Sequence, residues 1–95
     1  MGRRQSVEID LTAVTTRESL HTALASALGF PDFYGRNWAA FWDTITGLVE
    51  MPHRLVLRGW VPFEARLPEE AKCLRGCLED AAHQYPEWSA KVTLN

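Results

Sequence analysis

The sequence predicts an α/β fold, a two-layer sandwich in which a three-stranded parallel sheet packs against three main helices. Short apolar segments with the pattern of strands stand near both ends of the chain and in its middle. Segments whose apolar residues recur at helical spacing separate them. Alternating strands and helices imply parallel strands joined by right-handed crossovers. We expect the middle strand at the centre, in the sheet order 1-2-3.

The first strand is predicted over residues 7–11, where apolar residues alternate with acidic ones. Thr15 and Glu18 then have the spacing of a capping box and predict the start of a helix. Gly29 stands where a helix would end. The apolar residues between these points recur at helical spacing: Leu20, Ala23, Leu24, Ala27 and Leu28.

A second helix is predicted after a loop over residues 30–35, with Asn37 as its N-cap and an end near Leu48. On a helical wheel its core side consists of large apolar residues, namely Trp38, Phe41, Ile45, Leu48 and Val49, with Trp42 beside them. The opposite side consists of small residues and one carboxylate, namely Ala39, Ala40, Asp43, Thr44 and Gly47, with Thr46 at its edge.

The second half of the chain predicts a strand at residues 55–57, covered on both faces or flanked by neighbouring strands. Residues 59–68 are predicted to be irregular, with at most one helical turn around Phe63. Pro68 and the acids after it open a long helix to about Gln84. Its predicted buried face is Ala71, Leu74, Cys77, Leu78 and Ala81. The alternation of Ala90, Val92 and Leu94 predicts the last strand.

Length and charge narrow the class of protein. A chain of 95 residues fits one domain, residues 1–95. Ten Lys and Arg against twelve Asp and Glu give a formal net charge of -2, without the positive excess typical of nucleic-acid-binding domains. No apolar run approaches the ~20 residues of a membrane span. We therefore expect neither a nucleic acid nor a membrane as partner. The two cysteines, interpreted as free thiols, indicate a reducing compartment, and we expect a cytoplasmic location.

The histidines and cysteines argue against an enzyme. His21, His53 and His83 are interpreted as surface or capping residues. Cys73 and Cys77 are interpreted as buried free thiols; a zinc site that also recruits His83 is the alternative, with poor ligand number and spacing. No Gly-rich phosphate loop or nucleophile motif occurs in the sequence. We expect no catalytic residue, no metal and no cofactor.

The small side of the second helix is the most informative feature. A solvated helix surface normally carries several long charged side chains, and small residues allow another surface to approach closely. From spacing alone, an ordinary exposed helix face of low charge is the favoured interpretation, and a binding face is the alternative.

The same segment, FPDFYGRNWAAFWDTITG over residues 30–47, resembles the signature of the barstar family. The likeness rests on Gly35, Asn37, Trp42 and Asp43 at fixed spacing in a rare aromatic context, and the element order is similar over nearly the whole chain. The resemblance implies a barstar-like fold and a bacterial intracellular inhibitor, monomeric when free. Such a protein forms a 1:1 complex with a basic nuclease toxin and blocks its active site.

The resemblance also implies which residues contact the partner: Phe33, Gly35, Asn37, Ala39, Trp42, Asp43, Thr46, Gly47 and Asp80. Asp43 would occupy the phosphate position of the nuclease. Asn37 matches a family residue, but we expect it chiefly to cap the helix. Trp42 is equally well a core aromatic, and Asp80 a plain solvated acid.

Three departures from the family pattern bear on the partner. Ala39 stands where the family has an aspartate, Phe33 lacks the hydroxyl of the usual tyrosine, and Arg36 places a positive charge near the predicted contact. Fewer acids weaken electrostatic steering towards a basic enzyme. A different nuclease remains open as partner, and so does a protein-binding adaptor with a non-nuclease partner.

Overall fold

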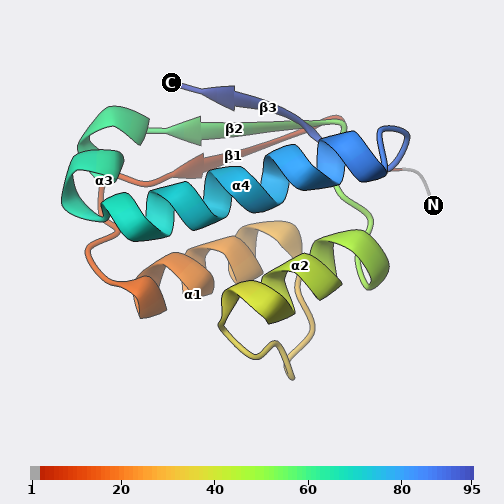
Figure 1. The fold of residues 1–95 in the computed structure, drawn as a ribbon, viewed down its shortest axis with the longest axis horizontal. Helices are drawn as coiled ribbons and strands as arrows, with labels where there is room; N and C mark the ends of the chain where they lie inside the picture. Colours follow the sequence, from red (N-terminus) through yellow and green to blue (C-terminus); the bar gives the residue numbers. More distant parts are fainter. Residues whose placement is uncertain (1–2) are drawn as a thin grey trace.

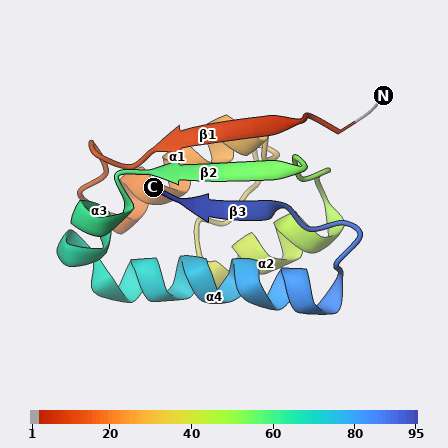
Figure 2. The same ribbon diagram turned by 90° about the horizontal axis from the view of Figure 1, so that it is seen from above.

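A three-stranded parallel sheet with the three longer helices beneath one face forms the fold of the computed structural model, which describes residues 3–95. The elements are β1 (Ser6–Asp10), α1 (Arg17–Leu28), α2 (Trp38–Gly47), β2 (Arg54–Arg58), α3 (Trp60–Arg66), α4 (Pro68–Gln84) and β3 (Lys91–Leu94). The sheet order β1-β2-β3 confirms the predicted topology, with the middle strand central. Figures 1 and 2 show α1, α2 and α4 on the same side of the sheet.

Strand register explains why only one face of the sheet is covered. Ile9 lies opposite Leu57, which lies opposite Leu94, and this row faces the helices. Alternate positions point the other way and are mostly charged and exposed: Glu8, Asp10, Arg54, Arg58 and Lys91. Val56 on this outer face is half-buried, so β2 is flanked by neighbouring strands rather than covered on both faces.

The start of α1 differs by one residue from the prediction. Thr16, not Thr15, is the N-cap, and its side chain accepts a hydrogen bond from the Ser19 backbone. The Ser19 hydroxyl accepts the reciprocal bond from the Thr16 backbone, so serine takes the place expected for Glu18. The predicted end is confirmed, because Gly29 adopts a left-handed conformation with φ 69°.

α3 is the one helix that the sequence prediction missed. It covers Trp60–Arg66, in the stretch expected to be irregular, and buries Trp60 and Phe63 against the core. Gly59 precedes it with φ 73°, and a Cβ atom there would lie 2.7 Å from the Thr12 side chain. Glycine is therefore required where β2 turns into α3.

α4 begins at Pro68 as predicted and buries a narrow stripe of Ala71, Leu74, Leu78 and Ala81. The prediction of two buried thiols is wrong: Cys73 is exposed and Cys77 is half-buried. Cys73 precedes Leu74 by one residue, which turns it about 100° away from that stripe. Burial raises the pKa of the Cys77 thiol and so disfavours the thiolate that metal binding needs.

The core lies between the sheet and the three long helices, with Leu11, Leu20, Phe41 and Leu55 fully buried in it. Among the described residues, no helix is long and apolar enough to cross a membrane. The same residues contain no group of three or more side chains placed to hold a metal ion.

Candidate functional site

α2 starts at a well-defined cap. Asn37 has an extended backbone, and its Oδ1 accepts a 2.7 Å hydrogen bond from the Ala40 amide. Its Nδ2 donates to the Gly35 carbonyl at 3.2 Å, which ties the loop to the helix start. The predicted capping role of Asn37 is confirmed, and both ends of its side chain are engaged within the chain.

Two residues before the cap have constrained backbones. A Cβ atom at Gly35 would lie 3.3 Å from both the Ala40 Cβ and the Asn37 side chain, so glycine keeps the cap uncrowded. Arg36 has φ 54°, in the left-handed region that non-glycine residues rarely adopt. Arg36 is exposed, directly before the residue that caps α2.

The loop before α2 is anchored from inside. The Tyr34 hydroxyl lies 2.6 Å from Nδ1 of His21 on α1, and the Tyr34 ring packs edge-on against Phe30. Burial raises the pKa of Tyr34 to about 12 and lowers the pKa of His21, so both groups are neutral near pH 7. With Tyr34 held inside, its neighbour Phe33 is left outside, 75% exposed.

His21 corrects a sequence prediction. Instead of a surface or capping residue it is fully buried, in contact with the rings of Tyr34 and Trp38. His53 and His83 are exposed, as expected. The neutral His21 ring supports the loop before α2 through its contact with the Tyr34 hydroxyl.

The inner face of α2 differs from the helical wheel at two positions. Phe41 and Ile45 are buried as predicted, but Thr44, assigned to the small outer side, is buried as well. Its hydroxyl donates a 2.7 Å hydrogen bond to the Ala40 carbonyl, which satisfies the polar group inside the core. Leu48, assigned to the core, is exposed because the helix ends at Gly47.

The outer face of α2 is a stripe of small residues with one acid. Ala39, Asp43 and Gly47 are spaced four apart and all exposed. Within residues 3–95, the Asp43 carboxylate accepts no hydrogen bond and forms no ion pair. The stripe therefore presents a carboxylate that has no partner within the described residues, and its small neighbours allow another protein surface to approach closely.

The remaining predicted contact residues border this stripe. Thr46 is half-buried and donates a 2.6 Å hydrogen bond to the Trp42 carbonyl. Trp42 is also half-buried, with its ring 6.5 Å from that of Tyr85, so it contributes to the packing and to the surface. Asp80 is exposed on α4, which packs beside α2 (Figure 1).

Exposed apolar side chains lie at both ends of α2 and beside it, and only Phe33 among them was predicted as a contact residue. Phe33 precedes the helix, Leu48 follows it, and Tyr85 adjoins Trp42. Trp88, 65% exposed, lines a hollow of about 240 Å³ together with Leu48 and the end of α2. The two aromatic residues that follow α4, Tyr85 and Trp88, are the sequence signal that could have indicated these exposed side chains.

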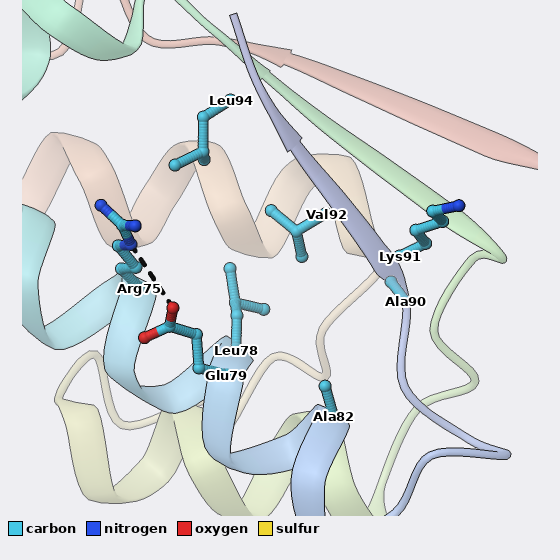
Figure 3. Close-up of a pocket in the computed structure, with 8 residues that line it drawn as sticks. All are labelled: Arg75, Leu78, Glu79, Ala82, Ala90, Lys91, Val92 and Leu94. Atoms are coloured by element: carbon cyan, nitrogen blue, oxygen red, sulfur yellow. Dashed lines mark ion pairs between the residues drawn. The ribbon is translucent and has the colours of Figure 1, made fainter.

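A second hollow lies away from α2. It has a volume of about 350 Å³ and is formed by α4 and β3, with Leu78 and Val92 among its apolar lining (Figure 3). An exposed Arg75–Glu79 ion pair of 3.5 Å stands at its rim. No residue of α2 or its loop lines this hollow, and its lining includes no histidine or cysteine.

Comparison with known proteins decides the family. The family model described as Barstar (barnase inhibitor) matches residues 4–94. This chain belongs to the barstar family. A Bacillus subtilis (strain 168) protein named "Putative ribonuclease inhibitor YrdF" is 51% identical to this chain over 43 residues. That match spans 45% of this chain and 47% of the relative, so it covers about half of each. The predicted family and barstar-like fold are confirmed.

Proposed function

We propose that this barstar-family chain binds a nuclease and blocks its active site through the outer face of α2 and the loop before it. The observation that carries the proposal is the stripe of Ala39, Asp43 and Gly47, small and exposed, with a carboxylate that has no partner within the described residues 3–95. The family match supports an inhibitor of a ribonuclease in general.

The chemistry of nucleases explains the carboxylate. A nuclease site holds phosphate with cationic side chains, and a carboxylate can occupy the same position and accept charge-assisted hydrogen bonds. Asp43 is the group that we place there. Because α2 is fixed by its cap and its buried face, the carboxylate is presented with little loss of backbone freedom on binding.

The surrounding residues complete the proposed contact. Phe33 stacks on the partner from the loop, and Thr46 and Gly47 form the distal end of the contact. Trp42 borders it, and Asp80 adds a peripheral acid. Gly35 and Asn37 act chiefly through the loop and the cap, since the described contacts of Asn37 lie within the chain.

We propose that the nuclease surface that meets Arg36 and Ala39 carries fewer positive charges than the active site of a typical ribonuclease. Ala39 supplies no charge on the stripe, and Arg36 stands exposed at its start. Close to Arg36, a nuclease with a neutral or acidic surface group fits this face better than one with a further cation. Whether the substrate is RNA or DNA does not change this requirement, because both present phosphate.

We further propose a 1:1 complex, a free monomer, a cytoplasmic location and no metal, cofactor or enzymatic activity. A toxin-immunity role follows if the nuclease is secreted by the same cell. The second candidate is an adaptor with a non-nuclease partner. Arg36 and Ala39 favour it, because both reduce the negative charge offered to a basic enzyme.

The discriminating experiment is a titration of this protein into a basic guanyl-specific ribonuclease at low salt, with RNA cleavage as the readout. Loss of activity that is complete at one equivalent supports the inhibitor. Unchanged cleavage at excess protein would exclude inhibition of this enzyme class and favour the adaptor.

A further inference from the structure

One carboxylate joins the starts of the three long helices. Glu70 lies in the first turn of α4. Its Oε1 accepts a 3.1 Å hydrogen bond from Nε1 of Trp38, the first residue of α2. The same oxygen accepts a 3.2 Å hydrogen bond from Nε of Arg17, the first residue of α1. Glu70 therefore links three segments that are distant in the sequence.

The surroundings of Glu70 make these contacts strong. Its side chain is only 13% exposed, whereas that of Arg17 is 65% exposed. A carboxylate withdrawn from water depends on its hydrogen-bond donors, and bonds to a charged acceptor are stronger than neutral ones. The indole of Trp38 has a single donor, and the structure directs it at Glu70.

Trp38 is held on its other sides by the core. Its ring centroid lies 4.6 Å from that of His21 and 5.3 Å from that of Phe41. The rings fix where the indole lies, and Glu70 fixes how it is turned. Since Trp38 is directly followed by Ala39, its position sets where the outer stripe of α2 begins.

We propose that Glu70 is a positioning residue for the partner-binding face of α2. It acts through Trp38, with Arg17 neutralising its charge, and makes no contact with the partner itself. The inference rests on the proposed function, because it assigns Glu70 a role in that same face. When the start of α2 is already ordered in the free protein, less conformational entropy is lost on binding. If that order is lost, the dissociation rate of the complex increases.

The test compares Glu70→Ala with Glu69→Ala in binding to a basic guanyl-specific ribonuclease. Both variants lose one negative charge at adjacent positions, so electrostatic steering changes equally. Glu69 is exposed and, within residues 3–95, has no ion pair or side-chain hydrogen bond. We expect Glu70→Ala to raise the dissociation constant roughly fivefold to tenfold, and Glu69→Ala to change it less than about twofold.

Two further variants separate positioning from general stability. Trp38→Phe keeps an aromatic ring but removes the donor, so its effect and that of Glu70→Ala should not add in the double variant. Val92 lies in β3, on the sheet, and packs against the core. Val92→Ala should therefore lower the free energy of unfolding but leave the dissociation constant of the folded protein unchanged. Full additivity of the first pair would contradict the proposed route through Trp38.

A second readout does not need the partner. Amide hydrogen exchange at residues 40–42, in the first turns of α2, should become several-fold faster in Glu70→Ala than in Glu69→Ala. Equal exchange and equal binding in these two variants would overturn the proposal. If the wild-type protein fails to bind the ribonuclease, the proposed function fails for that enzyme class. The exchange rates still decide whether Glu70 holds α2 in place.

Discussion

α2 and α4 lie side by side, yet their outer faces are built from different residues (Figure 1). The exposed face of α4 carries the long polar and charged side chains of an ordinary solvated helix, among them Glu69, Lys72, Arg75, Glu79 and His83. The exposed stripe of α2 carries Ala39, Asp43 and Gly47. Because both helices bury one side against the same core, the difference does not come from packing inside the chain.

Charge pairing differs in the same way. On α4, Arg75 and Glu79 form an ion pair one turn apart, with the 3.5 Å geometry of a surface pair. On α2, the Asp43 carboxylate has no such partner within residues 3–95. The exposed face of α4 thus carries long charged side chains with one ion pair among them, whereas α2 presents small residues around one carboxylate, unpaired among the described residues, that a partner can bind.

The largest effect is expected from filling the α2 stripe. Ala39→Arg adds bulk and a positive charge, and should raise the dissociation constant of a complex with a basic ribonuclease about 100-fold or more. Ala82→Arg makes the same change on the exposed face of α4 and should have little effect. Calorimetric titration measures both, and similar losses from the two variants would remove the distinction between the helices.

The next effect concerns the exposed aromatic of the loop. Phe33→Ala should weaken the complex about tenfold, since a large aromatic in contact with the partner contributes strongly to binding. The matched control is Val61→Ala on α3, similarly exposed but away from α2. Dissociation rates by surface plasmon resonance compare the two, and an unchanged rate for Phe33→Ala would exclude the loop from the contact.

Buried His21 predicts how stability depends on pH. Burial is the main cause of its lowered pKa; Arg17 and Arg36 lower it further, and Glu70 opposes them. The unfolded chain therefore binds the proton more readily. The contribution of His21 is complete above about pH 6.5 and declines below it, at most about 1.4 kcal/mol per pH unit.

Urea unfolding at a series of pH values between 5 and 7.5 measures this dependence. His21→Gln should flatten the slope, whereas His53→Gln, at an exposed position, should leave it as in the wild type. An unchanged slope in His21→Gln would mean that the buried ring does not carry the pH dependence.

The smallest expected effect is on the electrostatic steering of association with the ribonuclease. Ala39→Asp places a second carboxylate on the stripe, one turn before Asp43, and should raise the association rate with a basic ribonuclease severalfold at low salt. The gain should vanish near 1 M salt, where the Debye length is about 3 Å. Stopped-flow mixing measures the rate. A gain that persists at high salt would indicate a local contact instead.

Elements with strong local patterns were predictable from the sequence. Period-two alternation indicated β1 and β3, and Asn37 and Gly29 marked helix ends whose capping geometry is local. α3 escaped prediction because it has only seven residues, includes Pro62, and owes its helix to the burial of Trp60 and Phe63. That burial depends on the rest of the fold.

The candidate site was predictable only in part, for the same reason. The spacing of Ala39, Asp43 and Gly47 is local and places them on one face. Thr44 was misplaced because its hydroxyl bonds the backbone and so tolerates burial. The contacts of His21 with Tyr34 and of Glu70 with Trp38 join separate segments, and no periodicity in the sequence encodes them.

The central claim is that α2, and not α4, presents the carboxylate at the centre of the contact with the nuclease. The most direct test measures dissociation constants of Asp43→Ala and Glu69→Ala for a basic guanyl-specific ribonuclease under the same conditions. Asp43→Ala should cost roughly 2 kcal/mol or more, about 30-fold, because it truncates a carboxylate desolvated at the centre of the contact. Glu69→Ala should stay within about twofold. Equal losses from the two variants would contradict the account.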